Sequence, residues 1–315
     1  MNPLAVLYGA AVRARNELYD RGTLSLSHLQ GPVVSIGNIT VGGSGKTPFL
    51  ILLGELLKQY GIPCDVLSRG YRRRATGITP VDPVGSPREY GDEPLLIARK
   101  LGVPVIVGGD RYAAGQLAEE KFGPRLHLLD DGFQHRRLAR EFDIVLASPN
   151  DARDSLLPTG RLREPLSSLA RADAIVLTND TAGDGLRLGR QQVWRVTRDI
   201  VAPPTEESCL AFCGIARPQN FVAQLRAAGV MLAGTCSYRD HHRYSAEDVR
   251  RLLQLRKRLG ARAFVTTEKD AVNLAGYLAA LQPVHVVPVR MRLHNAAAVL
   301  EFILATVSER KRRPA

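Results

Sequence analysis

The feature that most constrains this chain is a glycine-rich segment at residues 37–48, which contains the triplet Gly-Lys-Thr. The apolar run at 33–36 predicts a buried strand, and the apolar periodicity of 46–60 predicts a helix. Strand, glycine-rich loop, Lys-Thr and helix is the order that a phosphate-binding loop needs. Glycines let backbone N–H groups turn inward, and the helix N-terminus adds unpaired donors. The segment therefore predicts a nucleotide-phosphate site.

Two side chains of this loop have predicted roles. Lys46 is expected to reach the outer phosphates, and the Thr47 hydroxyl is expected to ligate Mg²⁺. Thr40 stands where the strict motif has its first glycine, so a simple glycine turn is the alternative. The expected nucleotide-binding residues are Thr40, Val41, Gly42, Gly43, Ser44, Gly45, Lys46 and Thr47.

Strand-like and helical runs alternate along the chain, which predicts an α/β fold with a mostly parallel sheet covered on both faces. A stretch rich in Gly, Pro, Arg and Asp at 180–207 predicts a boundary, after which a smaller alternation follows. We expect a P-loop NTPase-like core domain at 1–195, a smaller α/β domain at 205–290, and a C-terminal helix with a basic tail at 291–315. The elements expected near the end of the chain are a helix at 272–281, a strand at 284–289 and a helix at 295–307.

The formal net charge of +12 calls for an anionic partner. The chain carries no motif that reads RNA or DNA, and its arginines are scattered, so we expect a membrane and an anionic substrate rather than nucleic acid. Residues 4–18 have helical spacing, with an apolar stripe too short to span a bilayer. This helix either lies in a membrane interface or packs on its own domain.

Several polar residues stand where strands are expected to end. Asp130 follows an apolar run, as a metal-binding acid of a phosphate-loop protein does, although a turn or helix cap is the alternative. Asp92, between Gly91 and Pro94, is either a base for a hydroxyl nucleophile or an N-cap.

The pair His241 and His242 follows a strand of the second domain, and one of them is a candidate to assist Asp92 across a cleft; exposed loop histidines are the alternative. Arg111 and the arginines of the 157–165 loop, Arg163 among them, suit charge that develops on a phosphoryl group. Solvated arginines are the alternative.

Together these motifs resemble the tetraacyldisaccharide 4'-kinases, the lipid A 4'-kinases of Gram-negative bacteria. The resemblance runs from the N-terminal helix to about Met291, and Thr40 is itself the family's form. The segments that carry it are residues 37–48, 68–71, 91–94, 130–135, 157–164, 240–242 and 267–270.

The resemblance implies two α/β domains joined by a short two-strand hinge, with the active site in the cleft between them. It implies phosphorylation, with ATP and Mg²⁺, of the 4'-hydroxyl of a tetraacylated disaccharide 1-phosphate, forming lipid IVA. It also implies a peripheral position on the cytoplasmic face of the inner membrane, where that lipid disaccharide resides. No obligate protein partner is evident.

The resemblance also implies roles for individual residues. Asp92 acts as a pair with a histidine, which we expect to be His241 rather than His242. The residues expected to stabilise the phosphoryl group are Lys46, Arg111 and Arg163, and those expected around the metal are Thr47, Asp130 and Glu164.

Two other classes of protein remain possible from the sequence. One is a membrane-associated ATPase of the partitioning type, whose deviant phosphate loop needs a lysine where this chain has Val41. The other is a nucleotide-gated binding module without catalysis. Transfer of phosphate to a lipid sugar, hydrolysis of ATP alone, or neither would distinguish the three.

Overall fold

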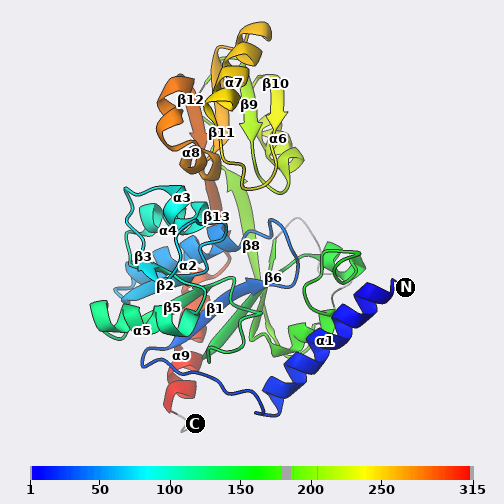
Figure 1. The fold of residues 1–315 in the computed structure, drawn as a ribbon, viewed down its shortest axis with the longest axis vertical. Helices are drawn as coiled ribbons and strands as arrows, with labels where there is room; N and C mark the ends of the chain where they lie inside the picture. The colour runs from blue at the N-terminus through cyan, green and yellow to red at the C-terminus, as the bar shows by residue number, and fades with distance from the viewer. Residues whose placement is uncertain (1, 179–185, 187, 204, 313–315) are drawn as a thin grey trace.

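The structure of the protein is a computed structural model, and it describes residues 2–178, 186, 188–203 and 205–312. Its two α/β domains are stacked along the long axis of the molecule, with the smaller domain at the top of Figure 1. The N-terminal helix lies along one side of the large domain, far from the small one.

In the described part of the chain, the large domain is built on a nine-stranded sheet of order β13-β8-β7-β6-β1-β5-β2-β4-β3. Neighbouring strands are parallel, except that β13 pairs with β8 and β3 with β4 in antiparallel fashion at the two edges. The expected α/β fold with a mostly parallel sheet is confirmed. The strands are β1 (Val33–Asn38), β2 (Cys64–Ser68), β3 (Thr79–Pro80), β4 (Val105–Val107), β5 (Leu126–Asp130), β6 (Phe142–Ala147), β7 (Ala174–Thr178), β8 (Gln192–Ile200) and β13 (Val289–Leu293).

Helices cover both faces of this sheet. Val34 of β1 is buried in one cluster with Phe49 and Leu300, whereas Val33 is buried in another with Ala114. Because successive side chains of a strand point to opposite faces, α2 and α9 cover one face and α5 covers the other. The helices of this domain are α1 (Pro3–Asp20), α2 (Lys46–Gln59), α3 (Pro87–Tyr90), α4 (Asp92–Leu101), α5 (Arg111–Phe122) and α9 (Ala296–Arg312), with 3₁₀ turns η1 (Pro149–Arg153) and η2 (Leu166–Arg171).

The small domain has a parallel sheet of order β10-β9-β11-β12, covered on both faces. One buried cluster contains Leu225 of α6, and the other contains Leu252 of α7. The elements are β9 (Cys209–Cys213), α6 (Pro218–Ala227), β10 (Leu232–Ser237), α7 (Ala246–Arg258), β11 (Ala263–Thr267), α8 (Glu268–Leu274), η3 (Ala275–Leu281) and β12 (Val284–Val287).

The two domains are joined by β8 and β13, which pair from Val289 opposite Ile200. The strand expected at 284–289 is divided, because Pro288 has no N–H for a sheet ladder. After Pro288 the chain turns back into the large sheet. The helix expected at 272–281 begins earlier, at Glu268, and breaks at Ala275, whose φ of 47° is incompatible with a right-handed helix.

The segment expected as a terminal helix and basic tail, at 291–315, belongs in its described part to the large domain, where β13 joins the sheet and α9 covers one of its faces. Arg310 forms an ion pair with Asp173 at 2.6 Å, and Lys311 donates a hydrogen bond to the Leu29 carbonyl at 2.9 Å. These two basic residues are therefore held on the domain surface. Arg313 lies outside the described residues.

The apolar stripe of α1 faces away from the protein. Leu4 and Leu7 are 61% and 69% exposed, while Gly9 and Asn16 on the opposite side are buried. The helix does pack on its own domain, through Gly9 and Asn16, but these two leucines are not part of that contact. None of the helices in the described part of the chain combines the length and the apolarity required to cross a membrane.

Candidate active site

The phosphate loop lies between β1 and α2 and is anchored at both ends. Gly45 precedes α2 with φ 87°, a left-handed conformation that strains any residue with a Cβ and therefore favours glycine. On the other side, the Val41 N–H donates to the Arg161 carbonyl at 2.8 Å. The loop therefore has a defined shape before any phosphate binds.

Asn38, at the end of β1, organises this loop, a role that sequence reasoning did not assign to it. Its Nδ2 donates to the Thr40 carbonyl at 2.7 Å and to Ser44 Oγ at 2.9 Å. Its Oδ1 accepts from Lys46 Nζ at 3.0 Å. One buried amide therefore fixes both the loop backbone and the lysine.

The acidic end of β5 lies directly beside the loop. β5 pairs in parallel with β1, with Asp130 opposite Ile36. The next residue, Asp131, has φ 50°. Its carboxylate forms ion pairs with Lys46 Nζ at 3.3 Å and with Arg163 Nη1 at 2.8 Å. A strained residue thus places a lysine and an arginine on one carboxylate.

The two neighbouring acids differ in their ionisation. Burial and the nearby charge of Glu93 raise the pKa of Asp130 to about 6, against the hydrogen bond that Ser68 donates at 2.7 Å. Burial also acts on Asp131, but Lys46 and Arg163 outweigh it and lower its pKa. Asp130 is therefore the acid whose charge is not yet balanced by a cation.

Asp130 and Thr47 both line the cleft, and a carboxylate and a hydroxyl are oxygen donors of the kind that Mg²⁺ binds. The described residues contain no cluster of three or more His, Cys, Asp or Glu side chains arranged for a metal. Magnesium does not require one, because it binds through one or two carboxylates together with substrate phosphates and water.

Glu164, in contrast, is buried away from the cleft, and its predicted place around the metal stays a prediction. Its carboxylate is fully buried, accepts from Asn16 of α1 at 2.7 Å and pairs with Arg171 at 2.9 Å. It does not line the cleft. Glu164 instead ties α1 to the loop that carries Arg163.

Removing Glu164 should therefore destabilise the fold. Glu164→Ala leaves the Arg171 guanidinium and the Asn16 amide without their partner, and we expect a loss of about 3–5 kcal/mol in the free energy of unfolding. Urea denaturation would measure it, with Glu164→Gln as the variant that keeps the contact to Asn16. Unchanged stability together with an altered Mg²⁺ requirement would instead support the predicted role of Glu164 around the metal.

Arg111 also lies outside the lining of the cleft. It is buried, and its guanidinium donates to the carbonyls of Gly109 at 2.8 Å and Gly108 at 3.4 Å. Burial lowers its pKa, against the charge of the nearby Asp130. Arg111 thus lies near Asp130 without reaching into the cleft, and its predicted contact with the phosphoryl group stays a prediction.

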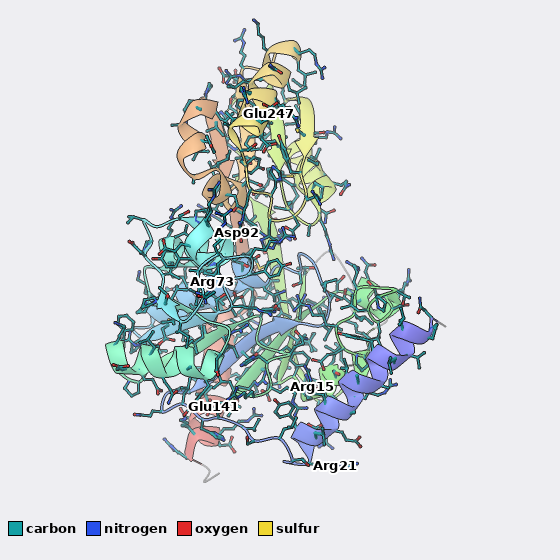
Figure 2. All side chains as sticks on the ribbon, in the orientation of Figure 1. Arg15, Arg21, Arg73, Asp92, Glu141 and Glu247 are labelled. Atoms are coloured by element: carbon teal, nitrogen blue, oxygen red, sulfur yellow. The ribbon has the colours of Figure 1, made fainter. Side chains whose placement is uncertain are left out.

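A cleft of about 1180 Å³ joins the phosphate loop to the small domain. Its lining includes Lys46, Asp92 and Asp130 from the large domain and His241 and Lys269 from the small one. Figure 2 shows Asp92 where the two domains meet. The carboxyl ends of parallel strands form such crevices, as the sequence predicts.

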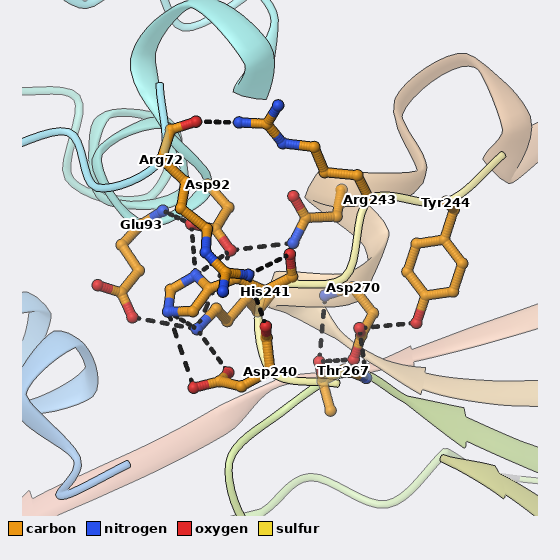
Figure 3. Close-up of polar contacts among 12 residues, drawn as sticks. Arg72, Asp92, Glu93, Asp240, His241, Arg243, Tyr244, Thr267 and Asp270 are labelled. Carbon is orange, nitrogen blue, oxygen red and sulfur yellow. Dashed lines mark hydrogen bonds and ion pairs between the residues drawn. The ribbon is translucent and has the colours of Figure 1, made fainter. Parts of the chain in front are cut away.

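Asp92 is the first residue of α4, and its carboxylate is aimed across the domain boundary (Figure 3). The N-cap of α4 is Gly91, which permits φ 94°, so the predicted N-cap alternative for Asp92 is wrong. Its Oδ2 lies 2.8 Å from His241 Nδ1 and accepts from Asn273 Nδ2 at 2.9 Å. Sequence reasoning missed Asn273, because 181 residues separate it from Asp92.

His241, not His242, makes this contact. His241 has φ 58°, which turns its ring toward Asp92, and its side chain is 14% exposed. His242 instead stacks on Tyr238, with ring centroids 4.4 Å apart, and pairs with Asp248 at 3.1 Å. The structure thus selects one of the two histidines that the sequence left as candidates.

The contacts of Asp92 determine its charge. Burial alone would raise the pKa of Asp92, but the hydrogen bond from His241 and the charge of Lys269 outweigh it and lower the pKa to about 2. The carboxylate is therefore ionised at neutral pH and available as a hydrogen-bond acceptor.

A phosphate loop with a lysine and an arginine on one side of a cleft, and an ionised carboxylate paired with a histidine on the other, defines a phosphate-loop phosphotransferase. The sequence places the chain more narrowly. Residues 1–308 match the family model described as Tetraacyldisaccharide-1-P 4'-kinase, and the chain belongs to that family.

Relatives of known name support this assignment. The chain is 49% identical to a tetraacyldisaccharide 4'-kinase of Koribacter versatilis over 99% of this chain and all of the relative. It is 39% identical to one of Geobacter metallireducens over 92% of each. The fold is similar to that of "apo" form LpxK from Aquifex aeolicus, crystallised in complex with ATP, with a TM-score of 0.81 and 34% identity over 97% of this chain and 98% of that one.

Proposed function

We propose that this protein transfers the γ-phosphoryl group of ATP to the 4'-hydroxyl of a tetraacyldisaccharide 1-phosphate, forming lipid IVA. The observation that carries the proposal is the pairing of Asp92 with His241 in the cleft that also holds the phosphate loop. Family membership supports the acceptor, and the ATP complex of the Aquifex aeolicus relative supports the donor.

The phosphate side of the site is a preorganised cationic pair. Asp131 holds Lys46 and Arg163 within 3.3 and 2.8 Å of its oxygens, so neither cation has to be recruited when charge develops on the transferring group. Fixed charges of this kind stabilise the transition state without reorganisation. Mg²⁺ held by Asp130 and Thr47 would neutralise charge on the outer phosphate oxygens.

The acceptor side is proposed to orient the sugar hydroxyl. Asp92 is ionised and is held by His241 and Asn273, so a hydroxyl placed in the cleft finds a fixed acceptor for its hydrogen. Its low pKa makes it a weak base, which suits a loose transition state in which the hydroxyl proton leaves late.

We also propose that α1 contacts the inner membrane, on the side where the lipid disaccharide is presented. Leu4, Leu7 and Leu18 form an exposed apolar face, and Arg13 of α1 and Arg21, which follows it, are also exposed. On the opposite side of α1, Asn16 donates to Glu164 at 2.7 Å, and the Tyr8 hydroxyl donates to the Arg163 carbonyl at 2.8 Å, so the helix is fixed to the active-site loop. A helix of this kind lies in the headgroup region.

The membrane contact predicts a large change in partitioning. Leu4→Ser with Leu7→Ser should move the protein from vesicles of anionic lipid to the free fraction, because burying two leucines is worth up to about 3–6 kcal/mol. Val84→Ser with Met231→Ser is the matched control, since these residues are 87% and 53% exposed but lie outside α1. Equal sedimentation of both double variants with vesicles would contradict the contact.

The function itself is tested with labelled ATP, Mg²⁺ and tetraacyldisaccharide 1-phosphate in detergent micelles, followed by NMR mapping of the new phosphate. A phosphate on O4' is the expected result. Hydrolysis of ATP without transfer would favour the ATPase of the partitioning type, which the family match and the absence of a lysine at Val41 oppose. Binding of ATP without turnover would favour a nucleotide-gated module.

A further inference from the structure

Lys269 contacts a polar cluster that spans the two domains, in which Figure 3 labels Asp92, Glu93, Asp240 and His241. Its side chain is 16% exposed, and Nζ lies 3.1 Å from His241 Nε2. The same atom lies 3.2 Å from Glu93 Oε1 of the large domain and 3.3 Å from Asp240 Oδ1 of the small one. Three short contacts match the three N–H bonds of one ammonium group.

This arrangement decides which ring nitrogen of His241 carries the proton. An ammonium donates and cannot accept, so Nε2 must present its lone pair to Lys269. The single proton of the neutral imidazole then sits on Nδ1, which donates to Asp92 at 2.8 Å. Burial disfavours the ammonium form of Lys269, but Glu93, Asp92 and Asp240 outweigh it and raise the pKa, so the donor stays charged.

We propose that Lys269 is a positioning residue for phosphoryl transfer, which holds His241 as the neutral Nδ1-protonated imidazole and thereby keeps Asp92 an ionised acceptor. The effect on phosphoryl transfer rests on the proposed function, whereas the position of the proton on the His241 ring does not.

The cluster explains why a cation is needed at this position. Asp92 and Asp240 lie beside the imidazole, with Asp240 Oδ2 3.8 Å from Nε2, whereas Glu93 contacts the lysine. Without the lysine, Nε2 would face the Asp240 carboxylate, an acceptor for a proton on that nitrogen, in place of a donor-only ammonium. An imidazolium protonated on both nitrogens would form a full ion pair with Asp92 and compete with the substrate hydroxyl for its oxygens.

The test is the ring protonation of His241 in full-length protein labelled with ¹⁵N-histidine, read at neutral pH from long-range ¹H–¹⁵N spectra. His241→Gln assigns the signal. In the wild type we expect a protonated Nδ1 and an unprotonated Nε2. In Lys269→Met we expect both nitrogens to be protonated, and Lys269→Arg, which keeps a donor-only cation, should restore the wild-type pattern.

A matched control is available at the same domain boundary. Lys100 of α4 forms an ion pair with Glu268 of α8, and no described contact joins it to His241. Lys100→Met should remove an ion pair between the domains without changing the His241 pattern. If it changes the pattern as Lys269→Met does, loosening of the domain boundary and not the donor is responsible.

Kinetics provides the second readout. Lys269→Met should lower kcat by about 10- to 100-fold, less than the loss of a base itself, with KM for ATP nearly unchanged. A proton on Nε2 in the wild type, or an unaltered pattern in Lys269→Met, overturns the inference. The expected NMR pattern without any kinase activity would instead overturn the proposed function.

Discussion

Lys46→Ala is expected to lower kcat for phosphoryl transfer by about 10²–10³-fold, the usual effect of removing one preorganised donor to developing charge. The lysine is the common partner of Asn38 and Asp131, so its loss also frees the loop amide. Asp130→Asn should weaken both the rate and the Mg²⁺ dependence, since a neutral amide replaces the carboxylate at the end of β5.

Steady-state rates at several Mg²⁺ concentrations measure both effects. Lys58→Ala is the matched control on the same helix, because Lys58 Nζ donates to the Leu101 carbonyl at the far end of α2. Activity within about threefold of wild type for Lys46→Ala and Asp130→Asn alike would remove the nucleotide-site assignment, since one lost donor should cost far more.

Asp92→Ala is the second variant with a large expected effect. It should lower kcat by about 10²–10⁴-fold, the usual contribution of a positioned proton acceptor, while the affinity for ATP stays nearly intact. His242→Ala is the matched control, because His242 pairs with Asp248 rather than with Asp92. If His242→Ala alone is damaging, the choice of His241 is wrong.

Much of the fold follows from the sequence because buried parallel strands are continuous apolar runs between polar turns. The apolar runs at 174–178, 209–213 and 263–267 are the strands β7, β9 and β11, and the helical pattern at 111–122 is α5. The break at Ala275 could not be predicted in this way, because nothing in a local apolar pattern marks an alanine with positive φ.

The site was predictable where it is local and not where it is assembled across the chain. Lys46 and Thr47 follow from a contiguous motif, and Asp130 from the end of one strand. The choice between a base and an N-cap at Asp92 was open from the residues, and only the resemblance favoured the histidine pair. Lys269 reaches Glu93 across 176 residues, a contact for which the sequence offers no periodic signal.

Glu164 shows a different limit. A glutamate beside Arg163 in a polar loop is equally compatible with a metal ligand and with a buried anchor. The deciding facts are that Asn16 comes within 2.7 Å and that the carboxylate is fully buried. Both depend on where α1 packs, and Asn16 of α1 lies 148 residues before Glu164 in the chain.

The central claim is that Asp92 and His241 act as one unit, and a double-mutant cycle on kcat tests it most directly. Groups that act together are not additive, so Asp92→Ala combined with His241→Ala should be little slower than the slower single variant. Effects that multiply, with the double variant slower by the product of the two single losses, would contradict the claim and show that the two residues have independent roles.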